Sequence, residues 1–441
     1  MMPTEVSASH RQRTLVVVRN ACLMILGKGG IYIAGLITAR MLVEYGGVES
    51  YGLWAPCAQA LMWVGLLDLG LGLGLQNMAS HAKDDADRRQ VAETAGAAFA
   101  ALVALAVVLA VAGILTRAFI PESLLFPLPS ILPGGLHESA SVVVLIAILG
   151  IAAGLAAQIP FRLIAGVQGH GTLTTIQGVV ALGVVPAIPL SQWLGLHWTF
   201  GLAVVAITPL LVPLVGGWIL LGRPEFNWAR PRWNGLEPLR RVVSASSALF
   251  VSQLAAILVF QTNIVIIGRL GGLTEAALMD ACLRILTVPL MAQSIVLAAI
   301  WPALAQAHAQ GDHAWVERTY RRGVKMTVGL MILCLLIAAA TPWLTPLLLG
   351  THGPRPHWSL VAGLFCFVCC SLWGGLHAQC LNALGLVRGA AVLAVLQAAL
   401  NLPAIILGYL WGGLDVVSWA SVAASLLTAV PGLTWLWRHR G

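Results

Sequence analysis

Long apolar runs separated by short polar connections fill most of the chain between residues 14 and 437. A helix needs roughly 20 predominantly apolar residues to cross the hydrocarbon layer of a membrane. Twelve runs reach this length, at residues 14–40, 50–77, 93–119, 139–163, 172–193, 198–221, 242–268, 274–304, 323–349, 358–384, 389–411 and 415–437. We therefore predict an all-α polytopic membrane protein with 12 transmembrane helices and no separate soluble domain.

The composition supports this prediction. Of the 441 residues, 59% are hydrophobic and 10% are charged, and the mean hydropathy is +0.88. Soluble domains are about one quarter charged. The first apolar run is too long for the core of a cleaved signal peptide, so we expect it to be retained as the first helix.

The segment LLDLGLGLGLQN, residues 66–77, is the most ambiguous part of the pattern. A strand would leave its backbone groups unpaired in lipid, because the other runs have the length of helices. A dinucleotide-binding loop needs glycines spaced as G-x-G-x-x-G, whereas the glycines here alternate with leucine. We therefore expect one helix across residues 50–77, with Gly70 and Gly74 open to a neighbouring helix and Asp68 inside the membrane.

Lysine and arginine are distributed unevenly between the two sets of connections, and the cytoplasmic set normally holds the excess. One side would carry 19 basic residues and the other side four, Arg40, Arg117, Arg269 and Arg355. The larger set comprises Arg11, Arg13, Arg19, Lys83, Arg88, Arg89, Arg162, Arg223, Arg230, Arg232, Arg240, Arg241, Arg318, Arg321, Arg322, Lys325, Arg388, Arg438 and Arg440. We expect both termini in the cytoplasm, and the pI near 9.3 requires no nucleic-acid partner to explain it.

Three pairs of short segments recur in the same order along the chain. They are YGGVESYGLW and LGGLTEAALM (from residues 45 and 270), HAKDDAD and HAQGDHA (from 81 and 308), and VPAIPL and LPAIIL (from 185 and 402). Ordered repeats of this kind are typical of transporters built from two related halves. We predict two parallel six-helix halves, residues 1–221 and 242–441, joined by a cytoplasmic interfacial linker at residues 222–241.

Five runs together resemble the polysaccharide-transporter branch of the multidrug/oligosaccharidyl-lipid/polysaccharide exporters. They are YGLW (51–54), LLDLGLG (66–72), QTNIVIIGRLGG (261–272), WPALAQAHAQGDHAWVERTYRR (301–322) and LNALGLVRGAAVLAVLQAALNLPAIIL (381–407). The resemblance implies a MATE-like fold and an O-antigen-type flippase in the bacterial cytoplasmic (inner) membrane. Its cargo would be an undecaprenyl-pyrophosphate-linked oligosaccharide, and its partners would be membrane lipids, a polysaccharide polymerase and chain-length proteins.

A pyrophosphate cargo calls for cations inside the membrane that face a wet cavity rather than lipid. Only two of the 25 basic residues lie deep within the apolar runs, Lys28 and Arg284. Lys28 lies in GKGG, about 21 Å along the first helix from Thr14 and close to the bilayer centre. Lys28 is a candidate both for binding phosphate and for neutralising Asp68, and the two roles are compatible because an ion pair can open when phosphate arrives. Asp68 is also a candidate for proton coupling. The sequence leaves these interpretations open.

Arg284 follows Asp280 by four residues, a spacing that favours an ion pair on one helix face. A guanidinium also binds phosphate through two parallel hydrogen bonds. Structural pairing and cargo binding therefore both remain open for Arg284.

Further polar side chains in the apolar runs are candidates for sugar binding or for a rim. Four amide side chains could bind sugar hydroxyls, Gln261, Asn263, Gln59 and Gln293, although polar side chains in membranes more often join helices. Members of the branch often carry an aspartate where this chain has Asn263, so a cation or proton role there is in doubt. Arg40 and Arg269, at the outer ends of the first and seventh helices, form a basic rim or extend to lipid headgroups.

Other function classes fit less well. The eight cysteines lie in or beside apolar runs without a nearby set of histidines, so we expect no metal and no cofactor. A cation-coupled multidrug exporter of the same fold needs acidic groups, and residues 14–40 contain none. An O-antigen polymerase or ligase needs a large reactive outer loop, which residues 120–138 do not provide, so we expect no enzyme activity. The connection HAKDDADRRQ lacks the glycine-aspartate-glycine-arginine pattern of a major-facilitator transporter.

Overall fold

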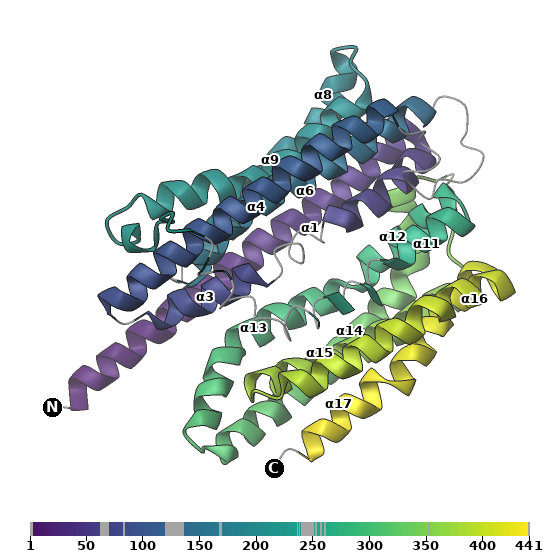
Figure 1. The fold of residues 1–441 in the computed structure, drawn as a ribbon. Helices are drawn as coiled ribbons and strands as arrows, with labels where there is room; N and C mark the ends of the chain where they lie inside the picture. Colours follow the sequence, from purple (N-terminus) through teal and green to yellow (C-terminus); the bar gives the residue numbers. More distant parts are fainter. Residues whose placement is uncertain are drawn as a thin grey trace. The chain divides into compact units, whose positions relative to one another are not determined.

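The computed structural model of the protein describes residues 3–61, 70–82, 84–119, 136–166, 170–235, 262–351 and 353–439, together with residues 237, 239, 251, 254, 255, 258 and 259. All regular elements in these residues are helices (Figure 1). Eight of them are long and apolar enough to cross a membrane. The helices α12 (Leu273–Leu286) and α13 (Val288–Ala309), bent by 47°, make a ninth span if they are counted together. The chain is therefore a multi-pass α-helical membrane protein.

The helices belong to two compact units. Unit 1 comprises residues 1–35, 67–114 and 148–247, and unit 2 comprises residues 36–66, 115–147 and 248–441. The helices with residues in unit 1 are the first part of α1 (Pro3–Leu61), α3 (Leu71–His81), α4 (Asp85–Phe119), α6 (Leu136–Gly166), α7 (His170–Val184), α8 (Ala187–Trp193), α9 (Trp198–Leu221) and the 3-10 helix η1 (Asn227–Ala229). Unit 2 holds the rest of α1, the end of α4, the first part of α6, and α11 (Thr262–Leu270), α12, α13, α14 (His313–Leu349), α15 (Trp358–Ala383), α16 (Val387–Leu427) and α17 (Ala429–Arg438). These units are not the halves expected from the sequence repeat, which stay a prediction.

The two longest helices are each interrupted at glycines. The backbone of α1 is non-helical at Gly47, and that of α16 is non-helical at Gly412 and Gly413. Each interruption falls between two consecutive apolar runs of the sequence. Each of these helices therefore contains one predicted span and the beginning of the next. Because residues 242–268 lie mostly outside the described part of the chain, the total of twelve spans and the cytoplasmic termini stay predictions.

The sequence repeat reappears in the local backbone. Gly47 and Gly272, which the first pair of repeated segments aligns, have nearly the same angles: φ 82° and ψ 168° in one, φ 90° and ψ 176° in the other. Positive φ is readily adopted only by glycine. The second pair of segments runs into the starts of α4 and α14. There Asp84 accepts a hydrogen bond from the backbone of Asp87 (2.7 Å) and Asp312 accepts one from Trp315 (2.9 Å), although the two aspartates are one residue out of the alignment of the segments. Equivalent turns and helix caps thus occur at two places in the chain.

The segment that was expected to form one helix across residues 50–77 is broken. Gly70 has left-handed backbone angles, φ 78° and ψ 2°, and stands at the start of α3, which begins at Leu71. A glycine was expected inside the helix as a small packing residue, but here its conformational freedom makes a turn. The expectation of a continuous helix was therefore wrong. Asp68 lies outside the described residues.

The described part of the predicted linker, residues 222–235, is held against the start of α4. The backbone N–H of Arg232 donates to the carbonyl of Ala92 (2.8 Å), and a Cβ added to Gly96 would overlap the carbonyl of Arg232. The guanidinium of Arg88 lies 5.5 Å from the centre of the Trp228 ring, a cation–π contact. The segment therefore has a defined attachment within unit 1.

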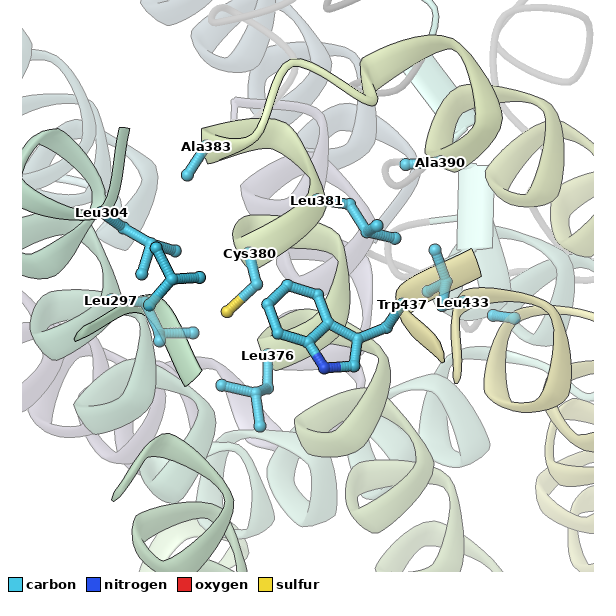
Figure 2. Packing of buried hydrophobic residues seen from close by; sticks show 11 residues of the cluster. Leu297, Leu304, Leu376, Cys380, Leu381, Ala383, Ala390, Leu433 and Trp437 are labelled. Atoms are coloured by element: carbon cyan, nitrogen blue, oxygen red, sulfur yellow. The ribbon is translucent and has the colours of Figure 1, made fainter. Parts of the chain in front are cut away.

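A buried apolar cluster holds together one end of the helices of unit 2. Figure 2 shows side chains of α15 between those of α13 and α17. Its labelled members are Leu297, Leu304, Leu376, Cys380, Leu381, Ala383, Ala390, Leu433 and Trp437. Beside it the ring of Tyr320 stacks on Trp437 at 4.2 Å, and its hydroxyl is 3.0 Å from Nε2 of His377. The cluster makes α13, α14, α15 and α17 a packed support for the rest of unit 2.

Candidate functional site

Lys28 belongs to a tight helix crossing in unit 1. A Cβ on Gly27 would overlap the backbone of Thr174 in α7, and a Cβ on Gly178 would overlap the carbonyl of Gly27. The Thr175 hydroxyl donates to the carbonyl of Leu23 (2.8 Å), one turn before the crossing. Contacts of backbone against backbone require small residues, as in other membrane helix pairs. Gly27 and Gly30 of GKGG therefore pack α1 closely against α7, whereas Gly29 takes no part in this crossing.

The Lys28 side chain itself lies on another face of α1. Successive residues of a helix are rotated by about 100°, so Lys28 points away from the face that carries Gly27. It is half-buried, and it forms no ion pair or hydrogen bond with any described residue. A Cβ on the adjacent Gly29 would have no atom within 4 Å. The predicted pairing of Lys28 with Asp68 stays a prediction, because Asp68 is outside the described residues.

Arg284 lies in a compact polar cluster of unit 2. Its Nε donates to Oδ2 of Asp280 at 2.6 Å and contacts the hydroxyl of Tyr51 at 3.1 Å. The Tyr51 hydroxyl in turn donates to the same carboxylate oxygen. Gln59 donates from Nε2 to the other oxygen, Oδ1 of Asp280, at 2.8 Å. The ion pair that the four-residue spacing predicted is therefore present, with two further partners from α1.

Burial makes this cluster energetically significant. Asp280 and Tyr51 are both 0% exposed, whereas the Arg284 side chain is 21% exposed. An isolated carboxylate in a low-dielectric interior is very unfavourable unless it is paired and hydrogen-bonded. Asp280 accepts hydrogen bonds on both oxygens, so its charge is compensated without water.

Two glycines bring the two segments of this cluster together. Gly272 immediately precedes α12 with a positive φ, and a Cβ on Gly52 would overlap the carbonyl of Leu273 at the start of that helix. Close approach at Gly52 places the neighbouring Tyr51 against Asp280. Sequence reasoning did not identify Tyr51 as a site residue, although YGLW was among the segments that carried the family resemblance. Tyrosine beside glycine in an apolar run was the available signal.

The predicted amide donors mostly join helices. Asn263 is buried, with 1% exposure, and its Oδ1 lies 3.4 Å from the amide nitrogen of Asn401 in α16. Gln293 donates to Thr327 (2.9 Å) and to the carbonyl of Leu372 (2.9 Å). Gln59 is committed to Asp280, as described above, and Gln261 lies outside the described residues.

The two arginines of the predicted outer rim both belong to unit 2. Arg40 lies 3.9 Å from Glu44, and both side chains are exposed, at 39% and 49%. Arg269 is exposed in the last turn of α11. All eight cysteines are free thiols, and the described residues contain no group of three or more histidine, cysteine or acidic side chains arranged to hold a metal ion.

Comparison with known sequences identifies a family that matches most of the chain. The profile of the family described as "Polysaccharide biosynthesis protein" matches residues 17–308, which cover both predicted cations. None of the curated proteins matches the chain significantly.

Solved structures with the same fold are transporters. An inward-facing multidrug resistance MATE family transporter of the MOP superfamily matches with a TM-score of 0.70 and 14% identity over 96% of both chains. A MATE crystal structure in the bent conformation gives a TM-score of 0.68 and 15% identity over 95% of this chain and 94% of that one. A MOP superfamily transporter from Pyrococcus furiosus gives a TM-score of 0.69 and 14% identity, with the same coverage of 95% and 94%. At this identity the similarity shows a MATE-like fold.

Proposed function

Because the chain belongs to the family of polysaccharide biosynthesis proteins and has a MATE-like membrane transporter fold, we propose that it is a lipid-linked oligosaccharide flippase. It moves an undecaprenyl-pyrophosphate-linked repeat unit of an O-antigen or another surface polysaccharide from the cytoplasmic to the outer leaflet of the bacterial inner membrane. A polysaccharide polymerase and chain-length proteins then act on the cargo.

The pair of intramembrane cations is the observation that supports this proposal most directly. Lys28 lies in a half-buried stretch of α1 without a described partner, and Arg284 is only partly covered by its own cluster. Charged side chains in membrane helices normally mark a substrate path or a wet cavity. A pyrophosphate needs such cations while it leaves water, because charge-assisted hydrogen bonds then replace its hydration.

The mechanism we propose is alternating access. Residues 1–221 and 242–441 rock against each other as two six-helix halves with both termini in the cytoplasm. The pyrophosphate and glycan occupy the central cavity, with Lys28 and Arg284 as their charge partners, and the polyprenyl chain stays in lipid between the halves. Gln261, Asn263 and the outer-rim arginines Arg40 and Arg269 remain candidates for glycan and headgroup contacts, and Asp68 for pairing with Lys28.

Complementation tests the proposal in cells. A strain that lacks its O-antigen flippase receives the native chain, Lys28→Ala or Arg284→Ala at matched membrane expression, and surface glycan is measured. We expect the native chain to restore glycan and each substitution to reduce it strongly. Restoration by both alanine variants at the native level would remove the two cations from the transport path.

A cation-coupled multidrug exporter is the second candidate, because multidrug transporters share this fold. The fold alone does not choose between the two functions, since for the Pyrococcus furiosus transporter the reverse polarity of the binding pocket is described as suggesting a different function. Resistance of the same strain to cationic drugs distinguishes them. Drug resistance without glycan restoration in several glycan backgrounds would replace the flippase by the exporter.

A further inference from the structure

The geometry points to Arg284 as an oriented anion-binding fork, with Tyr51 and Asp280 as the positioning residues that hold it from behind. In this arrangement an anionic group binds the two terminal amino groups of Arg284 while Nε stays paired with Asp280. The inference rests on the proposed function and deepens it, because it specifies how a phosphate of the cargo is recognised.

The first support is that the contacts of Arg284 with described residues use only one of its three guanidinium nitrogens. An arginine side chain carries five N–H donors in a planar fork. The contacts of Arg284 with Asp280 and Tyr51 both use Nε, and its two terminal amino groups have no hydrogen-bond partner among the described residues. The edge formed by the terminal amino groups therefore remains available for two parallel hydrogen bonds to an oxyanion.

The second support is the difference in exposure between the two sides of the pair. Asp280 is completely buried, whereas 21% of the Arg284 side chain is exposed. The carboxylate is therefore on the protein side of the guanidinium, and an incoming anion meets the arginine rather than the aspartate.

The third support is the hydrogen-bond direction at Tyr51. Its hydroxyl has one proton, which it donates to Asp280, so it meets Nε of Arg284 as an acceptor. Gln59 holds the second oxygen of the same carboxylate. Tyr51 and Gln59 thus donate to the carboxylate, and Arg284 donates from Nε to Asp280 and Tyr51. These contacts fix the plane of the guanidinium. Outer partners of this kind orient a ligand-binding group as they do in metal sites.

The charges in the cluster specify the kind of ligand. Asp280 neutralises Arg284, so the cluster offers little excess positive charge and recognition depends on the geometry of two parallel donors. A phosphate or pyrophosphate oxygen pair satisfies this geometry. The same chemistry is present in a lipid-linked and in a free phosphate, and two probes distinguish these sources.

The test is a double-mutant cycle between Tyr51→Phe and Arg284→Lys in the full chain in lipid nanodiscs. The affinity for farnesyl pyrophosphate and for inorganic pyrophosphate is measured by titration calorimetry. Because Tyr51 acts only through the arginine, we expect Tyr51→Phe to weaken farnesyl pyrophosphate binding by about threefold to tenfold in the native chain. In the Arg284→Lys background, which lacks Nε and the fork, it should have no further effect.

Controls separate this effect from general destabilisation. Tyr409→Phe removes another tyrosine hydroxyl of unit 2, which lies against Glu275, and should leave binding unchanged. Gln59→Leu loosens Asp280 through its second oxygen and should weaken binding in the same direction as Tyr51→Phe. Thermal unfolding of each variant verifies that it remains folded.

The outcomes are distinct. An equal loss from Tyr51→Phe in both backgrounds, or no loss in the native chain, would overturn the positioning role and leave the flippase proposal standing. No binding of farnesyl pyrophosphate by the native chain would contradict the proposed cargo itself. Equal affinity for inorganic pyrophosphate would support the fork and contradict recognition of a lipid-linked phosphate.

Discussion

The surroundings of the two intramembrane cations differ in almost every respect. Lys28 of unit 1 stands beside a glycine-mediated helix crossing and has no partner among the described residues. Arg284 of unit 2 is tied to a fully buried carboxylate that is itself held by Tyr51 and Gln59. The difference corresponds to the chemistry of the side chains, since an ammonium is a compact point charge and a guanidinium is a directional fork.

This contrast has an energetic consequence. A cation at the centre of a membrane helix costs about 2.5–3.5 kcal/mol on insertion scales. At Arg284 the protein offsets that cost with its own carboxylate, whereas at Lys28 the compensation must come from water, from residues outside the described part of the chain, or from cargo. The charge of Arg284 is therefore compensated within the protein, whereas that of Lys28 is not compensated by any described residue.

The largest expected effect concerns the buried ion pair. Asp280→Asn removes the charge that compensates Arg284 and should lower the free energy of unfolding by about 3–5 kcal/mol. Glu44→Gln breaks the exposed pair with Arg40 and should cost less than about 1 kcal/mol. Thermal unfolding of the purified variants in lipid nanodiscs measures both. Equal effects of the two substitutions would show that the Asp280 cluster is not a buried structural element.

The next effect concerns the helix crossing beside Lys28. Gly27→Val inserts a side chain into the backbone of Thr174 and should destabilise unit 1 by about 1–3 kcal/mol or more. Gly29→Val is the matched control, because its Cβ meets no atom within 4 Å. The yield of folded, monodisperse protein and its thermal unfolding report the difference. If Gly29→Val were as harmful as Gly27→Val, the crossing would not explain the glycines.

Exchanging the two cation types sharpens the comparison at the level of transport. Arg284→Lys keeps the charge but loses the Nε contact with Asp280 and the fork, so transport should fall about tenfold. Lys28→Arg keeps the positive charge at a position where no described partner requires a particular geometry, and transport should stay within about threefold of the native value. Surface glycan in the flippase-deficient strain measures both variants at matched expression. A larger loss of transport from Lys28→Arg than from Arg284→Lys would show that the geometry of the cation matters at position 28 rather than at position 284.

The smallest effect concerns a partly buried hydrogen bond of unit 2 away from Arg284. Tyr320→Phe removes the contact with His377 and should destabilise the protein by about 1 kcal/mol without changing transport. It serves as a reference for Asp280→Asn, since both substitutions alter polar contacts of the same unit but only Asp280 is fully buried. A transport defect from Tyr320→Phe at normal stability would extend the functional region beyond the cluster at Arg284.

Much of this organisation was visible in the sequence. Apolar run length predicted a multi-pass helical protein, and the acid-before-base spacing predicted the Asp280–Arg284 pair. The turn at Gly70 was missed because glycine has the same appearance in sequence whether it packs inside a helix or breaks one. The role of Tyr51 was missed because its partner is 229 residues away along the chain. Local spacing does not contain long-range contacts of this kind.

The most direct test of the flippase proposal is transbilayer movement in proteoliposomes. A fluorescent polyprenyl-pyrophosphate-linked disaccharide is incorporated with the native chain, Lys28→Ala or Arg284→Ala, and its arrival in the opposite leaflet is followed by reaction with a membrane-impermeant reagent. We expect rapid movement with the native chain and strongly slowed movement with each variant. Movement no faster than in protein-free liposomes, together with transport of a cationic drug by the same preparation, would contradict the proposed function.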